Sequence, residues 1–336
     1  MDGSQLYLAA ENRAAIEGHL HALGWLVPGE SLRALDKAGE GNMNVTLRAT
    51  TDRRTLILKQ SRPYVAKYPQ IPAPAQRIDL ENRFYTEVAR DGALAMRMPA
   101  RVGFDTANRL LALEDVGDGG DMLHLYADTA SQEPARGVMT ALVYWLWRLH
   151  ALAEVPAGDF ANTDMRALNH AHIFVIPFQP DSGAGIAPGL ETIATTFQQD
   201  DALKAAARAL GDIYLGRAPH ASRPCLLHGD YYPGSWLHNQ RLGVVIIDPE
   251  FAFVGAPEFD VGVMLAHLTF AGYTQADLMG ILRSYVTPPG FDYGLAMKFA
   301  AIESIRRLLG VAQLPLTAGT DQRLAWLHTA RGMLLA

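Results

Sequence analysis

The order of strand-forming and helix-forming segments is the feature that most limits what this chain can fold into. The first third contains short runs of β-forming residues bounded by turns, and these predict strands at 45–49, 55–60, 101–104 and 110–115. The first two runs are joined by the polar turn 50–54 and predict an antiparallel hairpin. A helix is expected over 79–90. This third of the chain therefore predicts a small antiparallel sheet.

The remaining two thirds have the pattern of helices. Apolar residues at helical spacing predict helices at 131–153, at 191–214 and across most of 258–336. Two short apolar runs, 225–227 and 244–247, are expected to be buried strands. The glycine-rich segment 117–120 separates the strand-rich region from the helix-rich region. We therefore expect one domain over 1–115 and another over 116–336. Strands followed by helices predict an α+β fold.

Composition excludes several classes of protein. The chain has 336 residues, and its 29 Lys and Arg against 35 Asp and Glu give a formal charge of −6, which argues against a nucleic-acid partner. The single cysteine, Cys225, excludes a disulfide scaffold. The sequence has no apolar run long enough to span a membrane, and its first residues lack the pattern of a secretory signal. We therefore expect a cytoplasmic protein with no membrane partner.

Three carboxylates form the most informative pattern of the sequence. Asp230 and Asp248 each follow a short apolar run, and Glu250 lies two residues after Asp248, so the last two can face the same side of an extended segment. Phosphoryl transfer needs such a set, because one carboxylate accepts the proton of the attacking hydroxyl while others hold Mg²⁺ across nucleotide phosphates. Ser235, five residues after Asp230, is predicted as a further oxygen ligand.

A nucleotide clamp is predicted upstream of these carboxylates. The loop before the hairpin holds the residues expected to approach phosphate groups, namely Gly39, Gly41, Asn42 and Asn44. Lys59, at the end of the second hairpin strand, matches a lysine that contacts the α- and β-phosphates, and Glu81 on the following helix is its expected partner. Glu114 and Val116 end the last strand of this region and are expected to present backbone groups to adenine.

These motifs together resemble those of the aminoglycoside phosphotransferase and choline kinase superfamily, and most of all its methylthioribose kinase branch. The matching runs are Gly39–Asn44, Leu58–Gln60, His228–Asp230 with Gly234–Ser235, Asp248–Phe253, Phe259–Gly262 and Glu303–Gly310. The resemblance extends from about residue 35 to about residue 315. It implies a protein-kinase-like two-lobed fold, with a β-rich ATP-binding lobe followed by a mainly helical lobe for catalysis and substrate.

The resemblance also implies a role for each matched residue. Asp230 would be the catalytic base, Asp248 and Glu250 would bind Mg²⁺, and Ser235 would lie near the metal or the phosphates. Lys59 would hold the phosphates of ATP. Arg306 and Arg307 would reach the substrate. The implied reaction transfers the γ-phosphate of ATP to the anomeric hydroxyl of 5-methylthioribose.

Several alternatives stay open. Tyr231, Tyr232 and Pro233 stand where the family has Leu-His-Thr after its His-Gly-Asp, and we expect the two tyrosines to shape the acceptor pocket. The acceptor is a small molecule: a sugar, or alternatively an aminoglycoside or amino alcohol. A third alternative is a pseudokinase without catalytic activity, and the chain could form a homodimer.

The two arginines are expected to have different partners. Adjacent helical residues point about 100° apart, so one arginine, preferably Arg306, is expected in the site and Arg307 on a structural carboxylate.

Two further residues are predicted to support the catalytic loop rather than to touch a ligand. His228 is expected to hydrogen-bond the backbone of this loop, and Asp260 is expected to orient the loop from behind. Trp145 and His150 are expected in the core of the helical region.

Overall fold

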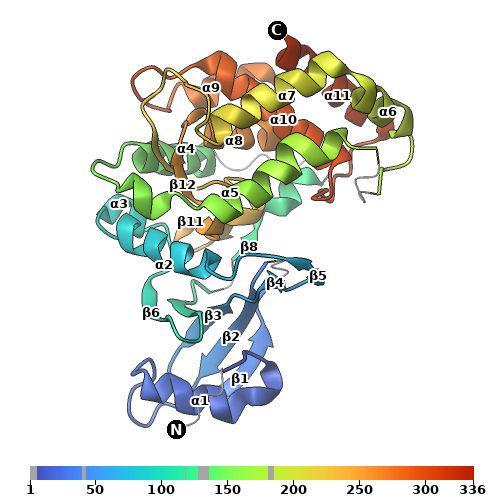
Figure 1. Cartoon of the computed structure of the whole chain (residues 1–336). Helices are drawn as coiled ribbons and strands as arrows, with labels where there is room; N and C mark the ends of the chain where they lie inside the picture. Colours follow the sequence, from blue (N-terminus) through green and yellow to red (C-terminus); the bar gives the residue numbers. More distant parts are fainter. Residues whose placement is uncertain (1–5, 40–42, 118, 128–135, 181–184) are drawn as a thin grey trace. The chain divides into compact units, whose positions relative to one another are not determined.

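The computed structural model describes residues 6–39, 43–117, 119–127, 136–180 and 185–336. These residues form two compact units. Unit 1 comprises residues 1–119 and 239–250, and unit 2 comprises residues 120–238 and 251–336. Figure 1 shows the strand-rich part in blue and the helix-rich part in green to red. That these units correspond to an ATP-binding lobe over 1–115 and a substrate-binding lobe over 116–336 stays a prediction.

Unit 1 is built on a five-stranded antiparallel sheet of order β1-β2-β3-β7-β6. Its strands are β1 (Leu32–Lys37), β2 (Val45–Thr51), β3 (Thr55–Gln60), β6 (Arg101–Asp105) and β7 (Leu110–Glu114). The predicted hairpin and both later strands are confirmed. β3 is central, because Leu58 pairs with Leu47 of β2 on one side and with Ala112 of β7 on the other. Lys59 therefore extends from a strand that is hydrogen-bonded on both edges.

Helices and a small hairpin complete this unit. The helices are α1 (Arg13–Ala22), α2 (Arg77–Val88) and α3 (Gly92–Ala95). Ile16 and Leu20 of α1 are fully buried in a core that contains Leu56 of the sheet, and Figure 1 shows α1 beside β1. The prolines of residues 61–76 favour a loop, yet this segment contains the short pair β4 (Tyr64–Val65) and β5 (Tyr68–Pro72). Proline is compatible with this pair because both strands of a two-stranded sheet are edge strands.

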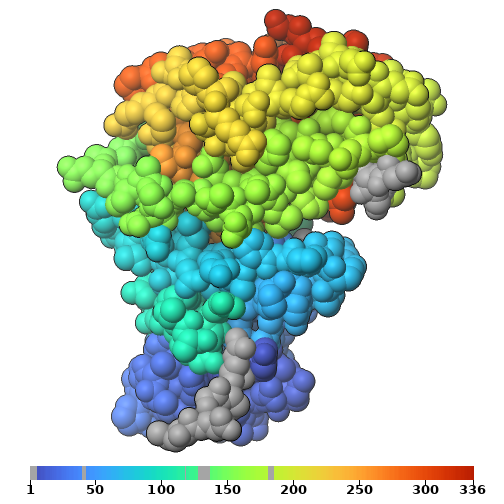
Figure 2. Space-filling view, viewed as in Figure 1, coloured from blue at the N-terminus to red at the C-terminus, as the bar shows by residue number. Residues whose placement is uncertain are grey.

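Unit 2 is mainly helical. Its helices are α4 (Arg136–His150), α5 (Thr163–His170), α6 (Glu191–Gln199), α7 (Asp201–Tyr214), α8 (Glu258–Phe270), α9 (Gln275–Leu282), α10 (Tyr293–Leu309) and α11 (Thr320–Leu335). α8 is buried along almost its whole length and packs against α10. α5, α6 and α7 contribute to the surface that Figure 2 shows in green to yellow. The unit therefore has α8 and α10 at its centre.

Short strands lead into the loops that carry the predicted site. β9 (Cys225–Leu227) pairs with β12 (Phe253–Gly255), and β10 (Trp236–Asn239) pairs with β8 (Gly120–Asp121). β11 (Gly243–Ile246) precedes Asp248 in unit 1. The apolar runs 225–227 and 244–247 are thus strands, as predicted. Within the described ranges no helix has the length and apolar character needed to cross a membrane.

Candidate active site

The loop after β9 carries Asp230 and is fixed from behind by a buried carboxylate. Asp260, at the start of α8, accepts the backbone N–H of His228 at 2.7 Å and that of Gly229 at 2.9 Å. His150 contacts the same carboxylate at 3.3 Å. The imidazole Nδ1 of His228 lies 3.4 Å from the backbone nitrogen of Asp230. The predicted supporting roles of Asp260 and His228 are therefore confirmed.

Gly229 gives this loop a conformation that few other residues can adopt. Its φ of +82° lies in the left-handed region. A Cβ added there would lie 2.1 Å from the carbonyl oxygen of Phe251, far closer than atoms can approach. The glycine thus allows the backbone to turn sharply between β9 and Asp230.

We expect Gly229→Ala to destabilise the chain by at least about 2 kcal/mol, because backbone strain and the clash with Phe251 add together. Thermal unfolding measures this change. The matched control is Gly18→Ala, at an exposed position within α1 where nothing lies within 4 Å of the added Cβ. That control should raise stability by roughly 0.5–1 kcal/mol through helix propensity. Equal stabilities of the two variants would contradict the assigned strain.

Asp230 faces both arginines of α10. Its Oδ1 lies 3.1 Å from an Nη of Arg307 and 3.8 Å from an Nη of Arg306. Both arginines also contact Glu303, Arg307 through its Nε at 2.5 Å and Arg306 at 3.1 Å. Burial raises the pKa of Asp230 above its usual range, and Arg307 and Arg306 partly oppose that rise. Although burial opposes it, the same two arginines hold the pKa of Glu303 well below its usual range.

The expectation that the two arginines point to different groups is wrong, while which of them binds the substrate stays a prediction. Arg306 and Arg307 do start about 100° apart on α10, but their long side chains converge on Glu303, three and four residues earlier on the same face. Arg307, which was expected on a structural carboxylate, contacts both that carboxylate and Asp230, and is the nearer of the two to Asp230. Sequence reasoning did not select Glu303 as a site residue, although its spacing to the arginines is the signal that could have found it.

The two tyrosines after Asp230 differ in their surroundings. Tyr231, expected to shape the acceptor pocket, is instead fully buried: its ring stacks on Trp145, and its hydroxyl donates to the carbonyl of Leu142 at 2.9 Å. The aromatic ring of Trp145 makes this position part of the core. Tyr232 is partly exposed, and its ring lies 4.7 Å from the guanidinium of Arg307. Of the pair, Tyr232 alone adjoins the arginines.

Ser235 closes the loop that carries Asp230. It is buried, and its hydroxyl donates to the backbone carbonyl of Asp230 at 2.9 Å. This bond holds the loop between Asp230 and the start of β10. The role of Ser235 near a metal ion stays a prediction.

A second cluster, in unit 1, gathers charged residues predicted to hold nucleotide and metal. The Nζ of Lys59 lies 2.6 Å from Glu81 and is also bonded to Asp248. Burial opposes ionisation of Lys59, yet Asp248 and Glu81 raise its pKa well above the usual range. Burial raises the pKa of Glu81, and Lys59 opposes that rise. The predicted pairing of Lys59 with Glu81 is therefore confirmed, and Asp248 joins it.

Glu250 lies in the same cluster but has other partners. Asn44 donates from its amide nitrogen to Glu250 at 3.0 Å, and Arg77 lies 3.6 Å from the same carboxylate oxygen. Burial, with the neighbouring charge of Glu81, raises the pKa of Glu250 to about 8. Asn44, expected to approach phosphate, thus contacts a predicted metal ligand.

Arg77 is a residue that sequence reasoning missed. It is buried at the start of α2 and donates to the side chain of Asn44 at 2.9 Å and to the carbonyl of Met43 at 2.6 Å. From sequence alone, an arginine in the first turn of a helix is expected at the surface, and Arg77 belongs to no recognised motif. Its packing under the 43–44 segment is visible only in the structure.

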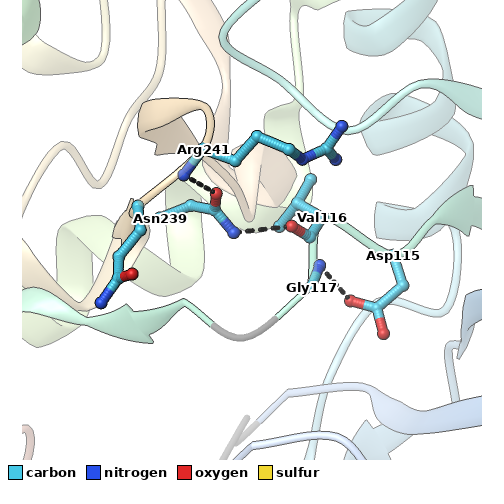
Figure 3. Close-up of a pocket in the computed structure, with 6 residues that line it drawn as sticks. Asp115, Val116, Gly117, Asn239 and Arg241 are labelled. Atoms are coloured by element: carbon cyan, nitrogen blue, oxygen red, sulfur yellow. Dashed lines mark hydrogen bonds between the residues drawn. The ribbon is translucent and has the colours of Figure 1, made fainter.

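The contacts predicted between nucleotide and the remaining residues stay predictions. Gly39 has a φ of +70°, while Gly41 and Asn42 lie outside the described residues. The backbone N–H of Glu114 donates to the carbonyl of Ala100 at 2.8 Å, so the sheet already uses this donor. The carbonyl of Val116 accepts from the amide of Asn239 at 2.7 Å (Figure 3). Their contacts with adenine stay a prediction.

Val116 lines a pocket of about 460 Å³ in unit 1. The other lining residues come from the end of the 110–117 segment and from the β10–β11 turn: Asp115, Gly117, Asn239, Gln240 and Arg241. Asp115 accepts the backbone N–H of Gly117 at 3.0 Å and pairs with Arg48 at 2.7 Å. These bonds, with that of Asn239, fix both walls of the pocket.

The fold defines a class of protein. The solved structure of spectinomycin phosphotransferase APH(9)-Ia, in complex with ADP and spectinomycin, has a TM-score of 0.57 to this chain. The alignment covers 98% of this chain and 99% of that protein at 11% identity, so it concerns the fold alone. The fold is that of the kinase-like α+β proteins, as predicted.

The sequence then gives the family. Residues 36–297 match the model of the phosphotransferase enzyme family (APH), so the chain belongs to this family and is a phosphotransferase with an alcohol group as acceptor. A methylthioribose kinase from Exiguobacterium sibiricum is 29% identical over 282 residues, which are 81% of this chain and 69% of the relative. Methylthioribose kinase 1 of Oryza sativa subsp. japonica is 25% identical over 264 residues, 74% of this chain and 59% of the relative. The predicted resemblance is confirmed.

Proposed function

We propose that this chain is an ATP-dependent small-molecule kinase that transfers the γ-phosphate to a hydroxyl of a sugar, with 5-methylthioribose or a related pentose as acceptor. The observation that carries the proposal is the Asp230 carboxylate, held by the loop bonds of Asp260 and faced by Arg307. A fixed carboxylate of raised pKa suits a group that orients a hydroxyl and accepts its proton. The names of the similar proteins supply the acceptor class.

Lys59, Asp248 and Glu250 are proposed to hold Mg-ATP. The residues present fit Mg²⁺, because Asp248 and Glu250 offer hard carboxylate oxygens and the side chain of Asp248 is 38% exposed. Among the described residues no group of three or more His, Cys, Asp and Glu forms a complete metal site. In a kinase, nucleotide phosphates and water complete the shell of Mg²⁺. The bound ion would neutralise charge on the phosphates during transfer.

The charge around Asp230 favours a neutral acceptor. Two cations, Arg306 and Arg307, face two carboxylates, Asp230 and Glu303, so the opposite charges in this cluster balance. A cationic aminoglycoside or amino alcohol would need an excess of carboxylate here. A polyhydroxylated sugar matches these groups.

The experiment is a nucleotide-consumption screen with the full chain and Mg-ATP against 5-methylthioribose, ribose, choline and spectinomycin. We expect ADP formation that depends on a pentose, and mass spectrometry should find the corresponding sugar phosphate. The wild-type reaction without an acceptor, run in parallel, subtracts any hydrolysis of ATP by water. Turnover of choline or spectinomycin alone would overturn the sugar assignment. Failure of the whole panel, with ATP bound, would support the pseudokinase reading.

A further inference from the structure

A buried polar chain lies behind the arginines of α10 and is not used by the proposed reaction. Tyr126 ends the helical turn η2 (Met122–Tyr126), and its hydroxyl lies 2.5 Å from Nδ1 of His267 on α8. The Nε2 of His267 lies 3.0 Å from Oε1 of Glu303 on α10. His267 is 0% and Glu303 1% exposed. These bonds thus join η2 and α8 to the carboxylate on α10 that holds both arginines.

Chemistry fixes the direction of each hydrogen bond in this chain. Glu303 is ionised by its two arginines and can only accept, so Nε2 of His267 carries the proton and donates to Glu303. The Nδ1 of the neutral ring is then an acceptor, and it takes the hydroxyl proton of Tyr126. Burial lowers the pKa of His267 to about 4, so the ring stays neutral at physiological pH. Tyr126 therefore donates to His267, and His267 donates to Glu303.

The same carboxylate oxygen fixes the orientation of Arg307. Oε1 of Glu303 accepts the N–H of His267 and also the Nε–H of Arg307, the latter at 2.5 Å. A guanidinium is planar and rigid, so fixing its Nε within a plane sets the direction of its Nη groups. The ring of Tyr232, 4.7 Å from that guanidinium, supports its face. One of the Nη groups thus directed meets Asp230 at 3.1 Å.

We propose that Tyr126 and His267 are positioning residues that, through Glu303, hold Arg307 in place on Asp230. The inference rests on the proposed function, since it takes Asp230 as the base. Without the N–H of His267, the carboxylate of Glu303 could rotate. The guanidinium of Arg307, which is bonded to that carboxylate, would then move away from its position at Asp230. A displacement of about 1 Å at a reacting group can cost about 100-fold in rate. A structural role alone would instead change stability and leave turnover in proportion to the folded fraction.

The kinetic test compares His267→Met with His267→Gln. Methionine fills the volume without a donor, whereas the glutamine amide can place an N–H near the position of Nε2. We expect His267→Met to lower kcat by about 10- to 100-fold with the KM for ATP within about twofold, and His267→Gln to stay within about threefold of wild type. His328→Met, an exposed histidine on α11, is the matched control and should be silent. Equal turnover of both His267 variants would overturn the proposal.

Tyr126→Phe tests the same chain with the loss of one oxygen and almost no packing. We expect a kcat about three- to tenfold lower and an unfolding temperature close to that of the wild type. Unchanged turnover in this variant would overturn the role of Tyr126 even where His267→Met folds poorly.

Nitrogen-15 NMR of labelled histidines separates this inference from the proposed function. We expect the His267 ring in wild-type protein to keep its proton on Nε2, with Nδ1 unprotonated, from pH 6 to pH 8, and Tyr126→Phe to shift the Nδ1 resonance. An imidazole protonated on Nδ1 would contradict the proposed hydrogen bonds between Tyr126, His267 and Glu303, whatever the substrate of the enzyme is. A correct tautomer in a protein that phosphorylates no acceptor would mean that the proposed function fails while the hydrogen-bonded chain stands.

Discussion

Replacing Asp230 by asparagine should lower kcat by about 10²- to 10⁴-fold and leave the affinity for ATP within about twofold of wild type. Asparagine keeps the shape of the side chain and an oxygen that can accept from Arg307. It cannot take the proton of an attacking hydroxyl. The loss should therefore fall on the chemical step, and calorimetry of ATP binding together with the rate of sugar phosphate formation measures the two parts separately.

The matched control is Asp212→Asn, the same exchange at an exposed position of α7. It should leave both quantities unchanged. Near-wild-type turnover in Asp230→Asn would show that another group acts as base. An equal loss of ATP affinity would place the residue on the nucleotide rather than on the acceptor.

The fold could be predicted from the sequence because its elements are locally encoded. The hairpin of β2 and β3 shows β-forming runs around a polar turn, and α10 shows apolar residues at helical spacing. The β4–β5 pair was missed because its prolines argue for a loop, and its pairing depends on a few contacts at an edge. Residues 239–250 belong to the same unit as residues 1–119. This grouping results from tertiary packing and cannot be predicted from composition.

The candidate site was predicted where a side chain's role follows from motif spacing. The pairing of Lys59 with Glu81 and the support of the loop by Asp260 belong to this kind. Tyr231 was misjudged because a large aromatic residue next to Asp230 is equally compatible with a pocket and with the core, and only its stacking on Trp145 decides between them. Arg77 and His267 carry no sequence signal, since their partners come from segments far apart in the chain.

Asp248→Asn should remove the dependence of ATP affinity on Mg²⁺. Asp248 has a φ of +62°, in the left-handed region, and asparagine is among the few residues that adopt this conformation readily. The substitution therefore tests charge without adding backbone strain. Asp248 is bonded to Lys59, so metal binding must compete with that ion pair. With an amide in place of the carboxylate, Mg²⁺ loses a charged ligand.

We expect wild-type protein to bind ATP at least about tenfold more tightly with Mg²⁺ than with EDTA, and Asp248→Asn to bind it equally under both conditions, with kcat lowered by about 100-fold or more. Asp36→Asn, exposed on β1 of the same unit, should keep the wild-type difference. A Mg²⁺ effect that survives in Asp248→Asn would move the metal site to other oxygen ligands. If Asp248→Asn also bound ATP more weakly than the wild type in EDTA, Asp248 would instead act by positioning Lys59. Without its partner, the lysine side chain would be misplaced for contact with the phosphates.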